Sequence, residues 1–228
     1  MCYNKDGDSM GKLIVICGSD CSGKETQAKK LVDALNKDFK AIYFSFPNYD
    51  SPTGKIIQNE CLGKNRESYF DEGFTSVDPY VSSLYYVTDR RYNLPKLNEL
   101  LNSYDYVICD RYTESNYAHQ GGKIKDKEER LKFYNFLERL EYDMLSLPKP
   151  DKVIFLSVSV SISCSLLDKR GGKDSAEKDL NYLTNSYNTY KEIAQIYNFD
   201  VIDCVKDDKL LSIDEIHSLV LEKIKNED

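Results

Sequence analysis

The sequence has few of the residues that build metal centres and membrane segments. Its 228 residues include only two histidines, His119 and His217, and none of its seven cysteines forms a C-x-x-C pair, so the ligand spacing of a zinc site is absent. An odd, unpatterned set of cysteines is typical of reduced thiols. There is no signal-peptide pattern and no apolar run of about 18 residues. These absences predict a cytoplasmic protein with no membrane contact.

The chain also lacks an excess of positive charge. It has 31 Lys and Arg residues and 38 Asp and Glu residues, which gives a net charge of −7. We therefore expect no nucleic-acid partner, and we expect any bound anion to be held by a few placed cations. The hydrophobic content of 41% is that of a globular protein. Because no repeat or linker divides the chain, we expect one domain over residues 12–228 after a flexible N-terminus, residues 1–11.

The motif Gly18-x-x-x-x-Gly23-Lys24 indicates a phosphate-binding loop. An apolar run leads into it and a helical pattern follows, which is the expected strand–loop–helix context. Glycines let successive N–H groups converge on phosphate oxygens, and the helix N-terminus adds partial positive charge. Lys24 can reach the terminal phosphates of a nucleoside triphosphate. The alternative is an ordinary strand–turn–helix unit, and Glu25 stands where Ser or Thr usually binds magnesium.

Strand and helix patterns alternate along the whole chain. The strand centres are continuously apolar, as in parallel sheets covered on both faces. The pattern predicts an α/β fold with a doubly wound, five-stranded parallel sheet, helices on both faces and ligands at the carboxyl ends of the strands. The predicted strands are residues 12–17, 41–44, 106–109, 153–156 and 201–203. The predicted helices are residues 24–37, 53–62, 79–103 with a new segment from Pro95, 127–146, 160–168, 176–197 and one opened by the capping box Ser212-x-x-Glu215.

Two polar clusters are candidates for the same site. Asp110-Arg111 closes the third predicted strand, where Asp110 can hold magnesium and Arg111 can bind a phosphate; the alternative is a strand-end salt bridge. Lys169, Arg170 and Lys173 flank two glycines and suit a lid near residues 168–178; the alternative is a solvated basic turn.

An aromatic residue and a cation lie on one face of the helix predicted near residue 86. Tyr86 and Arg90 are four residues apart and together could hold a planar base, although a tyrosine on a helix is more often core packing. His119 is isolated, and no nucleophile–base pair is apparent. Covalent catalysis is therefore disfavoured.

In this order, the motifs resemble those of the thymidylate kinase family, over residues 12–204. The resemblance implies a P-loop kinase fold and the phosphorylation of dTMP to dTDP by a nucleoside monophosphate kinase. It also implies ATP and dTMP as small-molecule partners, Mg²⁺ as cofactor and a homodimer. The motifs that carry it are Gly18-Ser19-Asp20-x-x-Gly23-Lys24-x-Thr26-Gln27, Phe46-Pro47, Tyr85-Tyr86-x-x-Asp89-Arg90, Asp110-Arg111-Tyr112-x-x-Ser115 and Lys169-Arg170.

The resemblance assigns roles to individual residues. The catalytic residues would be Lys24, Arg111 and Arg170, and the metal ligands Asp20 and Asp110. ATP would bind at Gly18, Ser19, Asp20, Cys21, Ser22, Gly23, Lys24, Glu25, Thr26 and Arg170. The substrate dTMP would bind at Asp20, Phe46, Pro47, Tyr49, Tyr86, Arg90, Arg111, Ser115, Asn116 and His119. Among these, Tyr86 would stack on thymine, Arg90 would donate to its carbonyl, and His119 would crowd the sugar 2′ position, which favours deoxyribose.

Three positions depart from the family's pattern. Glu25 replaces the usual Ser or Thr, so magnesium would depend on Asp110 and water. Asn48 replaces an arginine that often touches the monophosphate, which leaves that contact to Arg111 and Tyr49. Cys21 occupies a place where some members carry a catalytic arginine, which moves the catalytic cation to the lid.

Two alternative hypotheses about the function remain. The chain could be a kinase for another nucleoside monophosphate, such as dUMP, or for a deoxynucleoside. It could also be a non-catalytic nucleotide-binding protein, given Glu25.

Overall fold

A computed structural model describes residues 10–64, 68–171 and 176–225. Most of the predicted N-terminal tail, Lys173 of the basic cluster and the side chain of Arg170 lie outside this description. None of the helices within the described ranges is long and apolar enough to cross a membrane.

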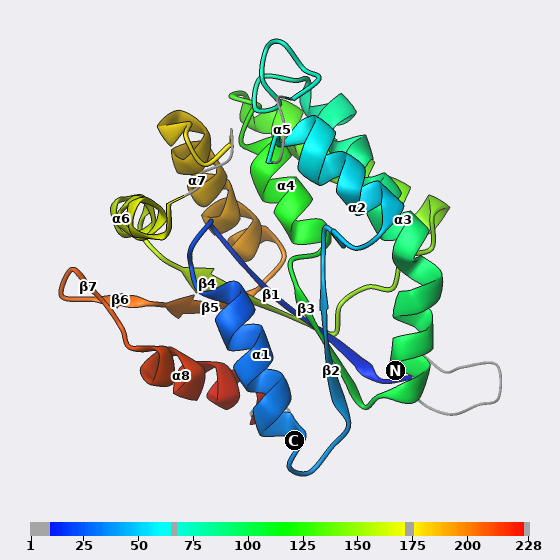
Figure 1. Ribbon diagram of the computed structural model, residues 1–228, viewed down its shortest axis with the longest axis vertical. Coiled ribbons are helices and arrows are strands. Elements are labelled where there is room, and N and C mark those ends of the chain that lie inside the picture. The colour runs from blue at the N-terminus through cyan, green and yellow to red at the C-terminus, as the bar shows by residue number, and fades with distance from the viewer. Residues whose placement is uncertain (1–9, 65–67, 172–175, 226–228) are drawn as a thin grey trace.

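A parallel sheet of five strands forms the centre of the fold (Figure 1). The strand order is β2-β3-β1-β4-β5, and every neighbouring pair is parallel. The strands are β1 (Lys12–Gly18), β2 (Ala41–Ser45), β3 (Tyr106–Asp110), β4 (Lys152–Ser157) and β5 (Asp200–Asp203). This parallel sheet confirms the predicted fold class. The continuously apolar strand centres had indicated it, because such strands are buried only when helices cover both faces of the sheet.

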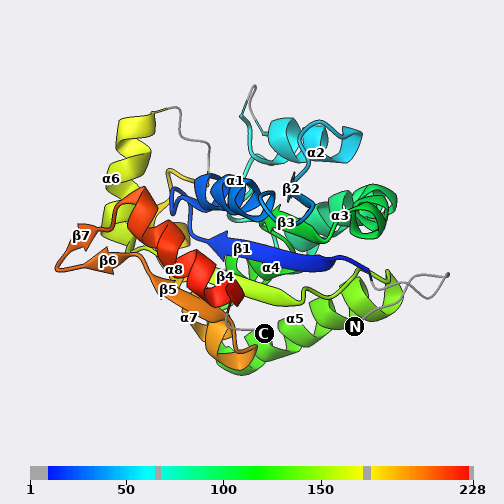
Figure 2. The same ribbon diagram turned by 90° about the horizontal axis from the view of Figure 1, so that it is seen from below.

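Helices cover the two faces of the sheet unequally (Figure 2). One face packs on α1 and α8, and the other packs on α3, α4, α5 and α7. The helices are α1 (Lys24–Leu35), α2 (Pro52–Ile56), α3 (Pro79–Ser103), α4 (Thr113–Gly121), α5 (Lys127–Glu138), α6 (Val160–Arg170), α7 (Leu180–Ile196) and α8 (Ile213–Lys225). Two π-helical turns, η1 (Ile57–Cys61) and η2 (Arg139–Met144), continue α2 and α5.

Three helix predictions need correction. Pro95 does not begin a new segment: α3 runs through it, because leucines on both sides of the proline are buried against the sheet and outweigh a cost of about 3 kcal/mol. The helix predicted over residues 127–146 changes to a π-helical turn at Arg139. Lys169 and Arg170 lie in the last turn of α6 rather than in a loop.

Two elements were not anticipated from the sequence. Helix α4 is buried along almost its whole length and starts at Tyr112 without a side-chain cap, so it shows neither an amphipathic pattern nor a start signal. A short antiparallel hairpin, β6 (Val205–Lys206) and β7 (Lys209–Leu210), follows β5.

Candidate active site

The carboxyl ends of β1, β2 and β3 meet at one level. In the register of the sheet, Asp110 of β3 pairs with both Ile16 of β1 and Ser45 of β2. Two backbone hydrogen bonds of 3.1 Å continue this arrangement past the strand ends: the Phe46 amide donates to the Asp110 carbonyl, and the Arg111 amide donates to the Ile16 carbonyl. A cavity of about 520 Å³ opens at this edge. It is lined by every predicted dTMP-binding residue: Asp20, Phe46, Pro47, Tyr49, Tyr86, Arg90, Arg111, Ser115, Asn116 and His119.

The phosphate loop forms the entrance to α1, and its glycines are required by geometry. Gly18 has a φ of 154°, and a Cβ there would lie 2.7 Å from the Leu156 carbonyl oxygen. Gly23 caps α1 with a left-handed φ of 83°. The loop residues that line the cavity are Asp20, Cys21, Gly23, Lys24, Glu25 and Thr26, whereas Gly18, Ser19 and Ser22 are buried and do not line it.

Lys24 is buried in the loop that it is expected to serve. Its Nζ donates to the Ser19 carbonyl over 2.6 Å, and burial together with the nearby Arg111 guanidinium lowers its pKa to about 8. Glu25 also lines the cavity, and its carboxylate forms an exposed ion pair with Lys29 at 2.6 Å. The negative charge of Glu25 is therefore paired with a cation on the same helix.

Arg111 connects the phosphate loop to α4. It has a left-handed φ of 64°, an unusual conformation for a residue with a Cβ, and it forms an ion pair with Asp20. Burial alone would raise the pKa of Asp20, but the guanidinium holds it well below its ordinary value. The Arg111 Nη1 also donates to Nε2 of His119 over 3.0 Å. Burial and the same guanidinium lower the pKa of His119 to about 3, so the imidazole is neutral near pH 7 and accepts this hydrogen bond.

Asp110 retains an acceptor for a further ligand. Its Oδ2 accepts from the Tyr43 hydroxyl over 3.4 Å, while its buried Oδ1 has no hydrogen-bond partner among the residues that the structure describes. Burial raises the pKa of Asp110. A buried, unpartnered carboxylate oxygen near the phosphate loop fits a residue that would receive a magnesium ion or its water.

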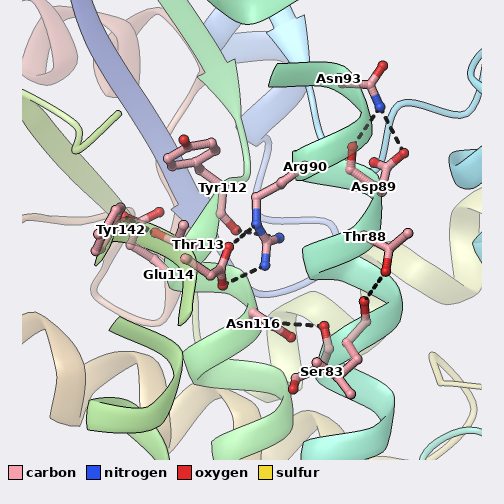
Figure 3. A network of polar contacts seen from close by, with 12 residues as sticks. Ser83, Thr88, Asp89, Arg90, Asn93, Tyr112, Thr113, Glu114, Asn116 and Tyr142 are labelled. Atoms are coloured by element: carbon pink, nitrogen blue, oxygen red, sulfur yellow. Dashed lines mark hydrogen bonds and ion pairs between the residues drawn. The ribbon is translucent and has the colours of Figure 1, made fainter. Parts of the chain in front are cut away.

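Helices α3 and α4 contribute cavity-lining groups that can bind a planar base. Arg90 is buried and forms a two-pronged ion pair with Glu141, with Nε–Oε2 and Nη2–Oε1 distances of 2.5 and 2.8 Å. Asn116 donates its amide Nδ2 to the Ser83 carbonyl over 3.3 Å, and its buried Oδ1 has no partner within the described residues. Figure 3 shows Arg90 extending from α3 toward the segment at the start of α4, and Asn116 of α4 facing Ser83 of α3.

The loop after β2 is fixed by Asp89, to which the sequence had given no role. Phe46 and Pro47 are joined by a cis peptide bond. The buried Asp89 carboxylate accepts from the Asn48 amide, Ser51 Oγ and Thr53 Oγ1 at 2.9, 3.0 and 2.7 Å. These contacts hold the loop residues that wall the cavity.

The chain matches the family model described as thymidylate kinase over residues 16–216. It belongs to the thymidylate kinase family. It is 31% identical to a probable thymidylate kinase of Methanocaldococcus jannaschii over 94% of this chain and 96% of that one. It is 27% identical to the thymidylate kinase of Plasmodium falciparum over 96% and 92%. The solved thymidylate kinase of Candida albicans has the same fold, with a TM-score of 0.70 at 24% identity, covering 95% of this chain and 92% of that one.

This thymidylate kinase family chain uses Asn48 structurally. The Asn48 Nδ2 donates to Asn93 Oδ1 over 2.8 Å, and Asn48 is not part of the cavity wall. The side chain at the position of the expected arginine is thus bound to α3 and does not line the cavity. Lys64, which sequence reasoning missed, does line the cavity and lies over the Tyr49 ring at 5.3 Å.

Residues in the predicted lid, and one residue just before it, reach the cavity from the C-terminal half of the chain. Leu166 on α6, and Ala176 and Glu177 before α7, line it. Glu177 is buried. The side chain of Arg170 and the whole of Lys173 lie outside the described residues, so their assignment to the catalytic site stays a prediction.

Proposed function

We propose that the protein transfers the γ-phosphoryl group of ATP to dTMP, giving dTDP and ADP. The observation that carries this proposal is that two sets of groups line one cavity. Lys24 of the phosphate loop lines it together with Arg90 and Asn116, and Arg111 lines it as well. A nucleoside monophosphate that bound its base at Arg90 and Asn116 would present its phosphate to Arg111 and to the loop.

The hydrogen-bonding pattern of Asn116 favours thymine or uracil over cytosine. Nδ2 donates one of its two N–H groups to Ser83, and the buried Oδ1 is an acceptor without a partner among the described residues, so it is available for a donor of the ligand. Thymine and uracil carry an N3–H donor beside a carbonyl acceptor, which complements Asn116 Oδ1 and an Arg90 N–H. Cytosine carries an acceptor at N3 and cannot make the N3–H hydrogen bond to Asn116 Oδ1, and the loss of that bond costs about 1–3 kcal/mol.

The reaction requires positioning and charge neutralisation rather than covalent catalysis. A phosphate monoester is already anionic near neutral pH, so it can attack the γ-phosphorus in line without a strong base. Lys24, Arg111 and Arg170 would stabilise the negative charge on the transferring group. His119 would hold the Arg111 guanidinium and narrow the space beside the sugar.

Magnesium is the cofactor that this chemistry calls for. Bound with ATP, it would neutralise phosphate charge during transfer. Asp110 would receive it through the unpartnered Oδ1, and Asp20 would help to organise it. Within the described residues no group of three or more His, Cys, Asp and Glu side chains could enclose a metal, so most of the magnesium ligands would come from ATP and water.

A panel of acceptors tests the proposal. ADP release is measured with Mg-ATP and, separately, dTMP, dUMP, UMP, dCMP and thymidine. The proposed function requires the highest kcat/KM with dTMP. A preference for UMP or dUMP would identify a kinase for another monophosphate, and a preference for thymidine a deoxynucleoside kinase. ATP binding without ADP release for any acceptor would identify a non-catalytic nucleotide-binding protein.

A homodimer is part of the proposal. Val81, Leu84 and Tyr92 of α3 are about half exposed and recur at helical spacing, so they form an apolar stripe along one side of the helix. A second copy of the chain would bury this stripe. Light scattering after gel filtration should give twice the monomer mass, and Leu84→Asp should give the monomer.

Three further assignments belong to the same proposal. Residues 12–228 would form one domain whose lid, residues 168–178, closes over the phosphates. The protein would act in the cytoplasm, consistent with the free thiols of all described cysteines. Neither nucleic acid nor membrane would be a partner. Limited proteolysis with and without ATP would show whether the lid segment becomes protected.

A further inference from the structure

Glu141 binds the guanidinium of Arg90 and does not itself line the cavity. It lies in the π-helical turn η2, and both partners of the ion pair are almost completely buried, with exposed side-chain fractions of 3% and 0%. A continuous α-helix through residue 146 would have placed the residues after Arg139 at other angles around the axis, because a π-turn adds one residue per turn. The irregular turn thus brings a carboxylate under the residue that is expected to bind the base.

The ion pair leaves a defined part of Arg90 free. Of the five N–H donors of an arginine, Glu141 takes one on Nε and one on Nη2. The Nη1 group lies 3.5 Å from the Tyr112 carbonyl oxygen. One N–H on Nη1 and one on Nη2 remain for a ligand, and the rigid fork with Glu141 fixes their directions.

A second buried carboxyl group, Glu114 of α4, lies near the same guanidinium. Its Oε1 accepts from Thr113 Oγ1 over 2.9 Å, whereas its Oε2 is buried without a hydrogen-bond partner in the described part of the chain. Figure 3 shows Arg90 pointing from α3 toward Tyr112, Thr113 and Glu114. Neither Glu114 nor Glu141 lines the cavity, so both act on a ligand only through Arg90.

We propose that Glu141 and Glu114 are positioning residues that together set how strongly Arg90 binds the pyrimidine. Glu141 orients the fork. An ionised Glu114 adds a second negative charge and offers an unpartnered acceptor that competes with the base for the remaining N–H donors. This inference rests on the proposed function, since it takes the base to lie against Arg90.

The surroundings of Glu114 make its charge responsive near neutral pH. Burial, together with the nearby Glu141 carboxylate, raises its pKa to about 7 against the opposing effects of Thr113 and Arg90. The groups that face it from β1, β3, α4 and η2 stay uncharged near neutral pH, because burial raises their pKa values; they are Cys17, Cys109, Tyr112, Tyr117 and Tyr142. Arg90 and Glu141 are therefore the charged neighbours that Glu114 meets among the described residues.

The first test separates base binding from the rest of the reaction. Glu141→Gln keeps the shape and removes the charge, and we expect it to raise KM for dTMP at least about tenfold while kcat and KM for ATP change less than about twofold. Glu141→Asp, which keeps the charge on a shorter side chain, should lie between this variant and wild type. Glu138→Gln is the matched control, because Glu138 pairs with Lys149 at the surface. An unchanged KM for dTMP in both Glu141 variants would overturn the role of Glu141.

The second test does not depend on a Glu141 variant that folds. KM for dTMP is measured from about pH 6 to about pH 8.5 for wild type and Glu114→Gln. Titration of the dTMP phosphate affects both proteins equally. The ratio of their two KM values therefore reports the ionisation of Glu114. We expect equal values near pH 6 and a several-fold lower KM for Glu114→Gln above about pH 7.5. Parallel profiles would overturn the role of Glu114.

The proposed function is judged separately, on wild type alone. If wild type does not phosphorylate dTMP, the proposed function fails, and the inference fails with it. If wild type phosphorylates dTMP while the Glu141 and Glu114 variants behave like wild type, only the inference fails.

Discussion

Asp20 of the phosphate loop forms an ion pair with Arg111, the residue that follows β3, across 91 positions of sequence. The pair joins the segments that follow β1 and β3, two of the three strands whose carboxyl ends form the site. It also means that a substrate phosphate arriving at Arg111 must share this guanidinium with a carboxylate. Arg111 is thus oriented before substrate binds, and its fork has partners on two sides, Asp20 and His119.

Arg111→Lys should therefore weaken dTMP binding despite keeping the charge. A lysine has no planar fork and cannot bridge Asp20, His119 and a phosphate together. We expect KM for dTMP to rise about tenfold or more with a smaller change in KM for ATP, measured by steady-state kinetics. Arg91→Lys, on the exposed side of α3, is the matched control. A KM for dTMP equal to that of wild type would remove Arg111 from the phosphate contact.

Lys24→Ala should abolish most of the catalytic rate. The variant loses a buried cation of the phosphate loop, and the loss of one such contact costs about a hundredfold or more in kcat. Lys29→Ala, five residues further along α1 and exposed, should keep the kcat of wild type. Turnover of Lys24→Ala close to that of the control would contradict the assignment of the phosphate loop.

Arg170→Ala tests the lid cation. If Arg170 supplies the charge that Cys21 cannot, kcat should fall at least about a hundredfold, with a smaller effect on KM for dTMP. Lys173→Ala should lie between wild type and Arg170→Ala. Unchanged kcat in both variants would show a solvated basic turn and would direct the search for the catalytic cation to Arg111.

Asp89→Ala should loosen the loop that walls the cavity. The substitution removes the acceptor for Asn48, Ser51 and Thr53 and leaves buried donors unpaired, so we expect the free energy of unfolding to fall by about 3 kcal/mol. KM for dTMP should rise as well, because Phe46 and Pro47 belong to the same loop. Urea unfolding and kinetics measure the two effects. Asp50→Ala, exposed in the same loop, should change neither; equal behaviour of the two variants would show that Asp89 does not hold the loop.

Glu114→Gln should stabilise the protein in a pH-dependent way. Folding raises the pKa of Glu114 from an ordinary 4.5 to about 7, so the folded state binds more protons than the unfolded state between these values. Wild-type stability is therefore lost as pH rises through this window, and the full penalty of about 3 kcal/mol is present above pH 7. Urea unfolding at about pH 5 and pH 8 should show little gain for Glu114→Gln at the lower pH and a larger gain at the higher. A gain that is independent of pH would contradict a titrating Glu114.

The local motifs were readable because each depends on short-range geometry. Gly18 and Gly23 are required where the backbone adopts positive φ, and Lys24 follows them at fixed spacing. Apolar strand centres implied a sheet buried on both faces, and the parallel-sheet rule then placed Asp110 and Arg111 beside the phosphate loop. The sequence alone therefore determined the fold class, the phosphate loop and the edge of the sheet at which the site forms.

Only the tertiary structure decided which side chains become partners. The sequence does not predict the ion pair between Glu141 and Arg90, which are 51 positions apart. The pair depends on a π-helical turn that no sequence pattern indicated. The fold also gives Asn48 a structural role, because its side chain donates to Asn93 and does not line the cavity. It gives Asp89 a role as well, because the Asp89 carboxylate holds the loop after β2. Partner choice depends on distance and on the energetic cost of leaving buried polar groups unpaired, and both exist only once the chain has folded.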